Sequence, residues 1–187
     1  MANFITSLNV TLKHEGGYAN LTGDSGGETI FGISRNNHPN ATLWAEIDNY
    51  KRIMHFKTKP CQNDISRMNS LCLNNKVVMK QVQDIYYNSY WLVIKGDRIH
   101  SQELANNIFD MAVNSGNSRA IKLIQSLLGI KVDGIVGNQT ISSINEYIDS
   151  KQLNNDYVIK RIEYYKSLNK SQFINGWINR TNYFLIK

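Results

Sequence analysis

The chain has 187 residues, which is the length of one domain or of one domain with a small second lobe. Hydrophobic residues make up 42% of it and charged residues 19%, so the composition is globular, and no apolar run approaches the roughly 18 residues of a membrane span. The formal net charge is +6, and the excess of positive charge lies in residues 51–100 and 151–187. Such basic segments either attract an anionic polymer or only keep the surface solvated.

The N-terminal third predicts one helix, a hairpin and a weaker helix. Phe4, Leu8 and Leu12 recur at helical spacing, Glu15 continues their stripe, and Gly16-Gly17 is expected to end the helix. The glycine-rich run that leads into Thr-Ile-Phe-Gly-Ile predicts a short β-hairpin near residues 23–33, the only sheet expected. A weaker helical pattern covers 41–56. The stretch 57–75, which contains Pro60 and both cysteines, is interpreted as an irregular connection.

The rest of the chain predicts further helices with apolar stripes. They resume at Lys76 and continue to Tyr90-Trp91, and a helix near 138 is expected to begin with Asn138 as its N-cap and to bury Ile148. Two further helices are marked by the apolar stripes Leu104, Ile108 and Ala112, and Ala120, Ile124, Leu127 and Leu128. The last two helices are expected over 154–168 and 171–184. The predicted fold class is therefore mainly α.

Three polar residues near the N-terminus carry the strongest chemical signal. Glu15 lies at a helix end on an apolar stripe, where partial burial disfavours the charged carboxylate, and Asp24 lies in a turn rich in backbone donors that favour it. Cleavage of a glycosidic bond needs one carboxyl group as proton donor and a second, ionised one for the oxocarbenium-like centre or the water. Glu15 and Asp24 fit these needs, and Thr29 enters the neighbouring strand. Taken alone, a Glu at a helix end and an Asp in a turn are usually surface features.

Metal, cofactor and protease chemistry find no support. Cys61 and Cys72 have no Cys or His beside them at metal-ligand spacing, so no metal and no cofactor are expected, and the two form one disulfide or none. Gly23-Asp24-Ser25-Gly26-Gly27 superficially matches a serine-protease nucleophile motif, but only His14 precedes it and the rest of the chain is helical.

Several motifs together resemble family 108 of the glycoside hydrolases, the N-acetylmuramidases of bacteria and phages. They follow the order of the family nearly from end to end: Glu15-Gly16-Gly17-Tyr18, Asp24-x-Gly26-Gly27-x-Thr29-x-x-Gly32-Ile33, Tyr86-x-x-x-Tyr90-Trp91, Asn106-x-x-Phe109-Asp110-x-Ala112-Val113-Asn114-x-Gly116, Asp133-Gly134-x-x-Gly137-x-x-Thr140, and Arg161 with Gly176-Trp177-x-x-Arg180.

The resemblance implies a lysozyme-like helical fold and cleavage of the β-1,4 bond between N-acetylmuramic acid and N-acetylglucosamine, with Glu15 as catalytic acid. Asp24 and Thr29 are similar to the partners of that acid in phage-type lysozymes. A catalytic lobe is expected over 1–116. A C-terminal helical lobe over 117–187, packed as part of one compact protein, resembles a peptidoglycan-binding unit.

Other residues are candidates for substrate contact. Tyr18 adjoins Glu15 and offers an aromatic face to a sugar ring, and Asp110 and Asn114 share one helix face, so that they either touch sugar or hold the Glu15 region. If their roles are only structural, Tyr18 is an aromatic residue of the core, and Asp110 and Asn114 form a polar cluster at a helix end.

The expected partner is bacterial peptidoglycan, with no nucleic acid, no stable membrane insertion and a monomeric state. The N-terminal residues do not resemble a secretory signal, which suits a phage endolysin held in the host cytoplasm until it is released to the wall. The alternatives are a bacterial enzyme with its own export route, a lytic transglycosylase, and a wall-binding protein without catalysis.

Overall fold

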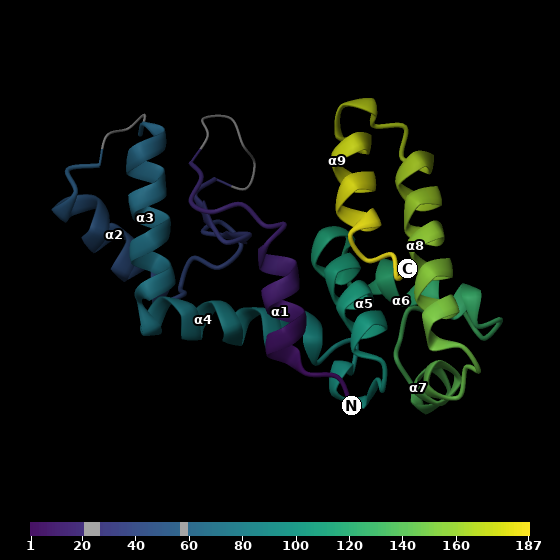
Figure 1. Ribbon diagram of the computed structural model, residues 1–187. Coiled ribbons are helices and arrows are strands. Elements are labelled where there is room, and N and C mark those ends of the chain that lie inside the picture. The colour runs from purple at the N-terminus through teal and green to yellow at the C-terminus, as the bar shows by residue number, and fades with distance from the viewer. Residues whose placement is uncertain (21–26, 57–59) are drawn as a thin grey trace. The chain divides into compact units, whose positions relative to one another are not determined.

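The computed structural model describes residues 1–20, 27–56 and 60–187, which form two compact units (Figure 1). One unit, here called the inserted unit, is Leu12–Tyr86. The other, the split unit, combines Met1–Thr11 with Tyr87–Lys187. Among the described residues the only sheet has two short strands, so the predicted mainly α fold is confirmed. No helix in these three ranges is long and apolar enough to cross a membrane.

The split unit is built around helix α5 (Gln102–Ser115), which packs against α6 (Asn117–Leu127) and α8 (Ser150–Ser167). Its N-cap is Ser101, whose hydroxyl accepts a hydrogen bond from the Leu104 amide. The other elements of this unit are α1 (Phe4–Leu12) up to Thr11, a π-helical turn η1 (Tyr87–Trp91), a 3₁₀ turn η2 (Gly96–Arg98), α7 (Asn138–Asn145) and α9 (Ser171–Asn182).

Helix α1 joins this unit through its N-terminal part. The ring of Phe4 lies 5.8 Å from that of Trp91 and 6.0 Å from that of Phe109, and the Ala2 amide donates to the Ile99 carbonyl. The core of the split unit therefore includes residues about a hundred positions apart in the sequence.

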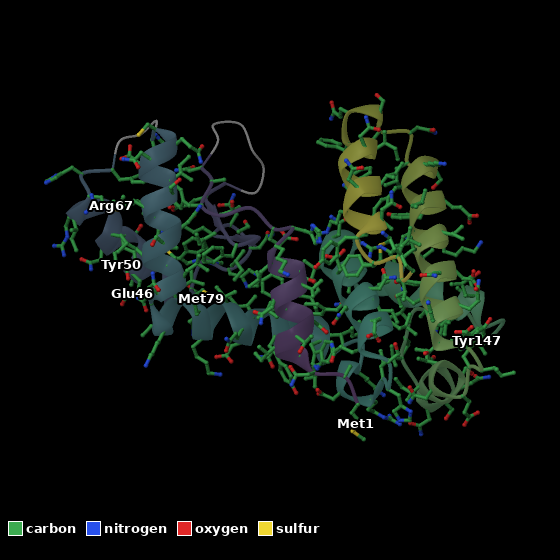
Figure 2. The ribbon with its side chains drawn as sticks, viewed as in Figure 1. Met1, Glu46, Tyr50, Arg67, Met79 and Tyr147 are labelled. Carbon is green, nitrogen blue, oxygen red and sulfur yellow. The ribbon has the colours of Figure 1, made fainter. Side chains whose placement is uncertain are left out.

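The inserted unit combines a hairpin with three helices. Strands β1 (Thr29–Ile30) and β2 (Ile33–Ser34) pair antiparallel, and the helices are α2 (Leu43–Ile53), α3 (Gln62–Asn74) and α4 (Lys76–Tyr86). At one corner, labelled by Glu46 and Tyr50 in Figure 2, the Asn75 side-chain amide donates to Glu46 Oε2 at 3.0 Å and to the Tyr50 hydroxyl oxygen at 2.7 Å. This side chain links α2 to the junction of α3 and α4.

The prediction of an irregular connection over 57–75 was wrong, because α3 occupies most of it. Pro60 stands outside the helix, just before the N-cap Cys61, where its missing N–H costs no helical hydrogen bond. Asp64 completes a capping box by accepting from the Cys61 amide at 3.1 Å, and Met68 and Cys72, four residues apart, are buried. Both cysteines are free thiols, so the open question of a disulfide is answered, and burial raises the pKa of Cys72 to about 12.

Two helix ends also differ from the predictions. Helix α1 ends at Leu12 rather than at the glycine pair, because the next turn, which contains Lys13 and Glu15, offers no apolar side chain to the core and isolated helical turns are not stable in water. Helix α7 has Gly137 as N-cap, whereas Asn138 lies inside the helix and accepts from Arg98. This helix ends at Asn145, which leaves Ile148 outside the predicted stripe and exposed.

Candidate active site

Glu15 lies in a bend just after α1 and is half-buried. The backbone that follows it is held by α3, because the Tyr18 amide donates to Asn69 Oδ1 at 2.7 Å. Gly17 allows this close approach, since a Cβ at that position would overlap the Asn69 side-chain amide. Asn69 therefore positions the segment after Glu15, and it lies in the stretch to which the sequence assigned no function.

The hairpin brings a second element against Glu15. Phe31 and Gly32 form its two-residue turn, and both have positive φ, +48° and +77°, as in a type I′ turn. A Cβ on Gly32 would lie 2.5 Å from the Tyr86 hydroxyl oxygen and 2.7 Å from Glu15 Oε2. The Tyr86 hydroxyl donates to the Phe31 carbonyl at 2.8 Å. The Glu15 carboxyl group and the end of α4 thus converge on a position that only glycine fits.

Gly32→Ala is expected to lower the free energy of unfolding by about 1–3 kcal/mol and to reduce activity sharply, because an alanine must adopt a left-handed backbone and also displaces Glu15. Urea unfolding and clearance of a wall suspension measure the two effects. Gly116→Ala is the matched control, since Gly116 has φ +88° and a Cβ added there would meet nothing within 4 Å. If both variants clear walls at the parental rate, the contact between Gly32 and Glu15 has no role in catalysis.

Thr29 lies on β1, beside the segment that follows Glu15. Its amide donates to the Ala19 carbonyl at 2.8 Å, the Ala19 amide donates back at 3.0 Å, and the Thr29 hydroxyl lies 3.5 Å from the same carbonyl. The structure therefore brings the predicted Glu15 and Thr29 into one unit and links their segments. The predicted Asp24 lies outside the described residues.

Tyr18 is only 4% exposed, and its ring packs edge-on against Phe56 at 5.2 Å. Its pKa is raised well above the ordinary value for tyrosine, first by burial and then by a hydrogen bond to the neighbouring Glu28 and by the charge of that carboxylate. Glu28 in turn pairs with Arg35 at 2.9 Å and with Lys51 at 2.5 Å. Tyr18 thus takes part in a core cluster that joins the segment after Glu15 to the hairpin and α2, and its contact with substrate stays a prediction.

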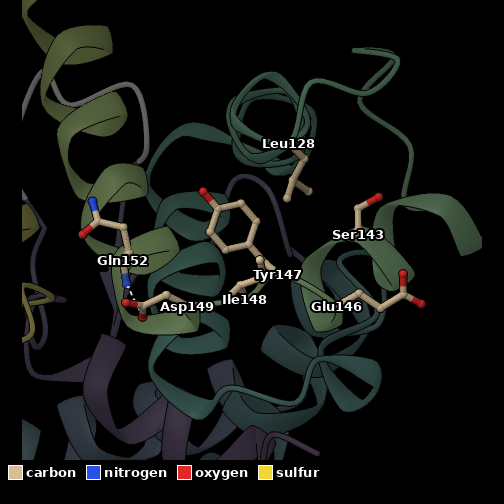
Figure 3. A pocket seen from close by; sticks show the side chains of 7 residues that line it. All are labelled: Leu128, Ser143, Glu146, Tyr147, Ile148, Asp149 and Gln152. Carbon is tan, nitrogen blue, oxygen red and sulfur yellow. Dashed lines mark hydrogen bonds between the residues drawn. The ribbon is translucent and has the colours of Figure 1, made fainter.

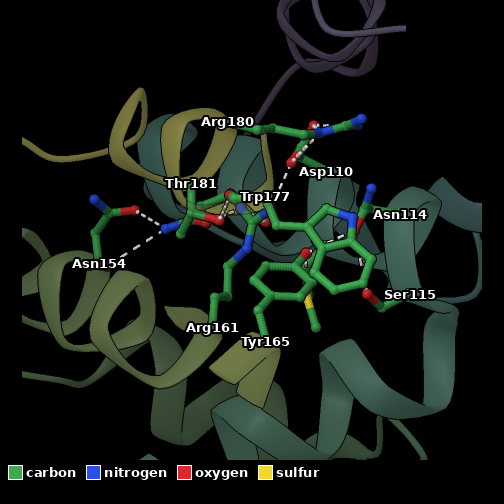
Figure 4. Close-up of polar contacts among 11 residues, drawn as sticks. Asp110, Asn114, Ser115, Asn154, Arg161, Tyr165, Trp177, Arg180 and Thr181 are labelled. Atoms are coloured by element: carbon green, nitrogen blue, oxygen red, sulfur yellow. Dashed lines mark hydrogen bonds and ion pairs between the residues drawn. The ribbon is translucent and has the colours of Figure 1, made fainter. Parts of the chain in front are cut away.

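Asp110 is completely buried in the split unit, between two arginines (Figure 4). Its Oδ2 lies 2.6 Å from Nη2 of the buried Arg161, and its Oδ1 lies 2.7 Å from Nη2 of Arg180. Asn114, one turn further along α5, accepts a hydrogen bond from the Tyr165 hydroxyl at 2.7 Å. The two residues therefore join α5 to α8 and α9, and their predicted contact with sugar stays a prediction.

Clusters of metal-binding side chains are absent from the described part of the chain: nowhere do three or more His, Cys, Asp or Glu residues gather as a metal site requires. The chemistry that the described site offers is that of a half-buried carboxyl group that lies beside the hairpin turn at Gly32 and near the Tyr86 hydroxyl.

Comparison with known proteins adds independent evidence. A family model described as Glycosyl hydrolase 108 matches residues 8–116, and one described as Predicted Peptidoglycan domain matches residues 119–182. The chain is similar to a solved structure titled "Structure of Brucella abortus SagA", with 23% sequence identity, 97% of this chain and 90% of that chain covered, and a TM-score of 0.66. This likeness concerns the fold. No curated protein sequence matches the chain.

The two compact units are defined by contacts in three dimensions, and their bounds differ from those of the predicted lobes, 1–116 and 117–187. The division into these two lobes stays a prediction. Asn69 belongs to none of the sequence motifs, and Tyr86 and Gly32 occur in them only as members of longer patterns.

Proposed function

Because the chain belongs to the glycosyl hydrolase 108 family, and is therefore a glycoside hydrolase that acts on peptidoglycan, we propose that it is an N-acetylmuramidase with Glu15 as general acid. The bond cleaved is the β-1,4 linkage from N-acetylmuramic acid to N-acetylglucosamine. The observation that carries the proposal is the position of the Glu15 carboxyl group, which is half-buried and lies beside Gly32 and near the Tyr86 hydroxyl.

In this mechanism the protonated Glu15 side chain donates its proton to the glycosidic oxygen as the bond to the leaving sugar breaks. Partial burial and close neighbours favour that role, because they restrict the orientation of the carboxyl group that must face the leaving oxygen. The proposal gives Asp24 the second carboxylate function, which is to stabilise the oxocarbenium-like centre or to activate water. Thr29, from the strand joined to the segment after Glu15, is proposed to orient that water.

Product analysis of digested, purified peptidoglycan tests this assignment. We expect fragments that end in reducing N-acetylmuramic acid, detected by mass spectrometry after borohydride reduction, which adds two hydrogens to each such end. Fragments that end in anhydro-muramic acid would instead identify a lytic transglycosylase, and intact glycan strands a binding protein without catalysis. Reducing N-acetylglucosamine ends would show that the other glycosidic bond is cleaved.

The proposed biological setting is host lysis by a phage endolysin that is held in the host cytoplasm until it reaches the wall. The match to a peptidoglycan domain supports wall contact. Cell fractionation after expression tests the setting: the protein is expected inside intact cells, which should lyse once their inner membrane is permeabilised, and lysis without permeabilisation would contradict it.

A further inference from the structure

A hollow of about 530 Å³ lies in the split unit, where the end of α6, the end of α7 and the start of α8 meet (Figure 3). This volume is within the range of sites that bind small ligands. All the residues that line it lie within the part of the chain matched by the peptidoglycan domain, and no residue of the candidate active site is among them.

One wall of the hollow is apolar although it is not part of the core. Leu128, Tyr147 and Ile148 line it, and Figure 3 shows the Leu128 side chain directed toward the space beside the Tyr147 ring. Tyr147 is 38% exposed and Ile148 is fully exposed, whereas Ile141 and Ile144 of the preceding helix are 5% and 4% exposed. Exposed apolar side chains that gather around a hollow offer a ligand a surface that water solvates poorly.

The charged groups of the hollow are all acidic. Glu146 and Asp149 line it together with the neutral Ser143 and Gln152, and no lysine or arginine is among its lining residues, although the chain as a whole carries a net charge of +6. Asp149 is held in place because its Oδ1 accepts from the Lys151 amide at 3.0 Å and from the Gln152 amide at 2.9 Å. The hollow therefore suits a ligand that combines a positive charge with an aliphatic chain.

We propose that this hollow binds the uncrosslinked stem peptide of peptidoglycan through the free ammonium group of its diamino acid. The ammonium group lies near the Glu146 carboxylate, and the methylene chain that bears it covers Tyr147 and Ile148. The carboxylates of the stem stay outside, where the acidic side chains do not repel them. The inference rests on peptidoglycan as substrate and adds which chemical group of the polymer the C-terminal region recognises.

The test is a titration of the ¹⁵N-labelled full chain with the synthetic stem peptide N-acetyl-L-Ala-γ-D-Glu-L-Lys-D-Ala-D-Ala at low salt, followed by NMR; the N-terminal acetyl group replaces the amide bond to N-acetylmuramic acid. Amide shifts are expected at residue 128 and over 143–152. The same peptide with an acetylated lysine side chain should bind about two- to fivefold more weakly, the effect expected for a solvent-exposed ion pair.

Two variants and two matched controls assign the binding to the hollow. Glu146→Gln and Ile148→Ala change exposed side chains and should each weaken binding of the free-amine peptide by a similar factor without loss of stability. Glu163→Gln and Ile159→Ala make the same changes at exposed positions of α8 that do not line the hollow, and they should bind like the parent.

Equal affinity for the free and acetylated peptides, or no saturable shift at the hollow at millimolar peptide, would overturn the proposal. Binding of peptide-free glycan strands at the same residues would also overturn it. Cleavage of those strands by the same preparation reports glycosidase activity separately. A failed titration with intact cleavage therefore removes the stem-peptide site alone, and successful binding without cleavage removes the proposed muramidase activity alone.

Discussion

Glu15→Gln is expected to fold like the parent and to lose about two to four orders of magnitude in the rate of wall lysis. Glutamine has nearly the same shape and still fills the space beside Gly32 and Tyr86, but its amide cannot donate the proton that the leaving oxygen needs. Turbidity clearance of purified walls measures the rate, and circular dichroism with urea unfolding measures the fold.

The matched control is Glu46→Gln, which makes the same change in the same unit. Glu46 accepts a hydrogen bond from Asn75, and the amide oxygen of glutamine accepts it equally, so activity should stay within about twofold of the parent. A Glu15→Gln protein that clears walls at close to the parental rate would rule out Glu15 as the acid. The second carboxylate, Asp24, would then be the next residue to test.

Asp110→Asn is expected to have the largest effect on stability, a decrease of about 3–5 kcal/mol in the free energy of unfolding. Removal of its charge leaves the guanidinium of Arg161, which is completely buried, without its counter-ion, and weakens the pairing with Arg180. The loss follows from the cost of a buried unpaired charge rather than from the strength of the original pair. Equilibrium unfolding in urea measures it.

Asp84→Asn provides the comparison, since Asp84 pairs with Lys80 at the surface of α4 and both side chains are solvent-exposed. Such pairs contribute about 0–1 kcal/mol. If the two substitutions cost the same, Asp110 is not essential to the stability of the split unit. Such a result would favour the predicted contact between Asp110 and the substrate.

The sequence predicts elements well wherever an apolar stripe has no interruption. Helix α5 follows Leu104, Ile108 and Ala112, all of which are buried. The prediction failed at α3, because Pro60 suggests a loop although a proline before an N-cap does not disturb a helix, and because the apolar stripe of this helix is short, with only Met68 and Cys72 buried. It failed again at Ile148, because periodicity cannot show where a helix stops when no glycine or proline marks the end.

The candidate site was only partly predictable for a related reason. Glu15 and Thr29 are close in sequence and belong to one recognisable pattern, and the structure links their segments through Ala19. The residues that hold this segment come from elsewhere: Asn69 is 51 positions from Tyr18, and Tyr86 is 55 positions from Phe31. Contacts over such separations depend on how helices pack, and local patterns carry no information about them.

The interrupted chain path of the split unit has a consequence for biosynthesis. Residues emerge from the ribosome in order, and domains generally fold as units soon after they emerge. The inserted unit, Leu12–Tyr86, can therefore collapse while the partners of Met1–Thr11 are still untranslated. Phe4 can pack against Trp91 and Phe109 only after those residues have been synthesised. Asp110 can pair with Arg161 and Arg180 only later still. Residues 1–11 are therefore synthesised before the inserted unit but complete their packing only after it.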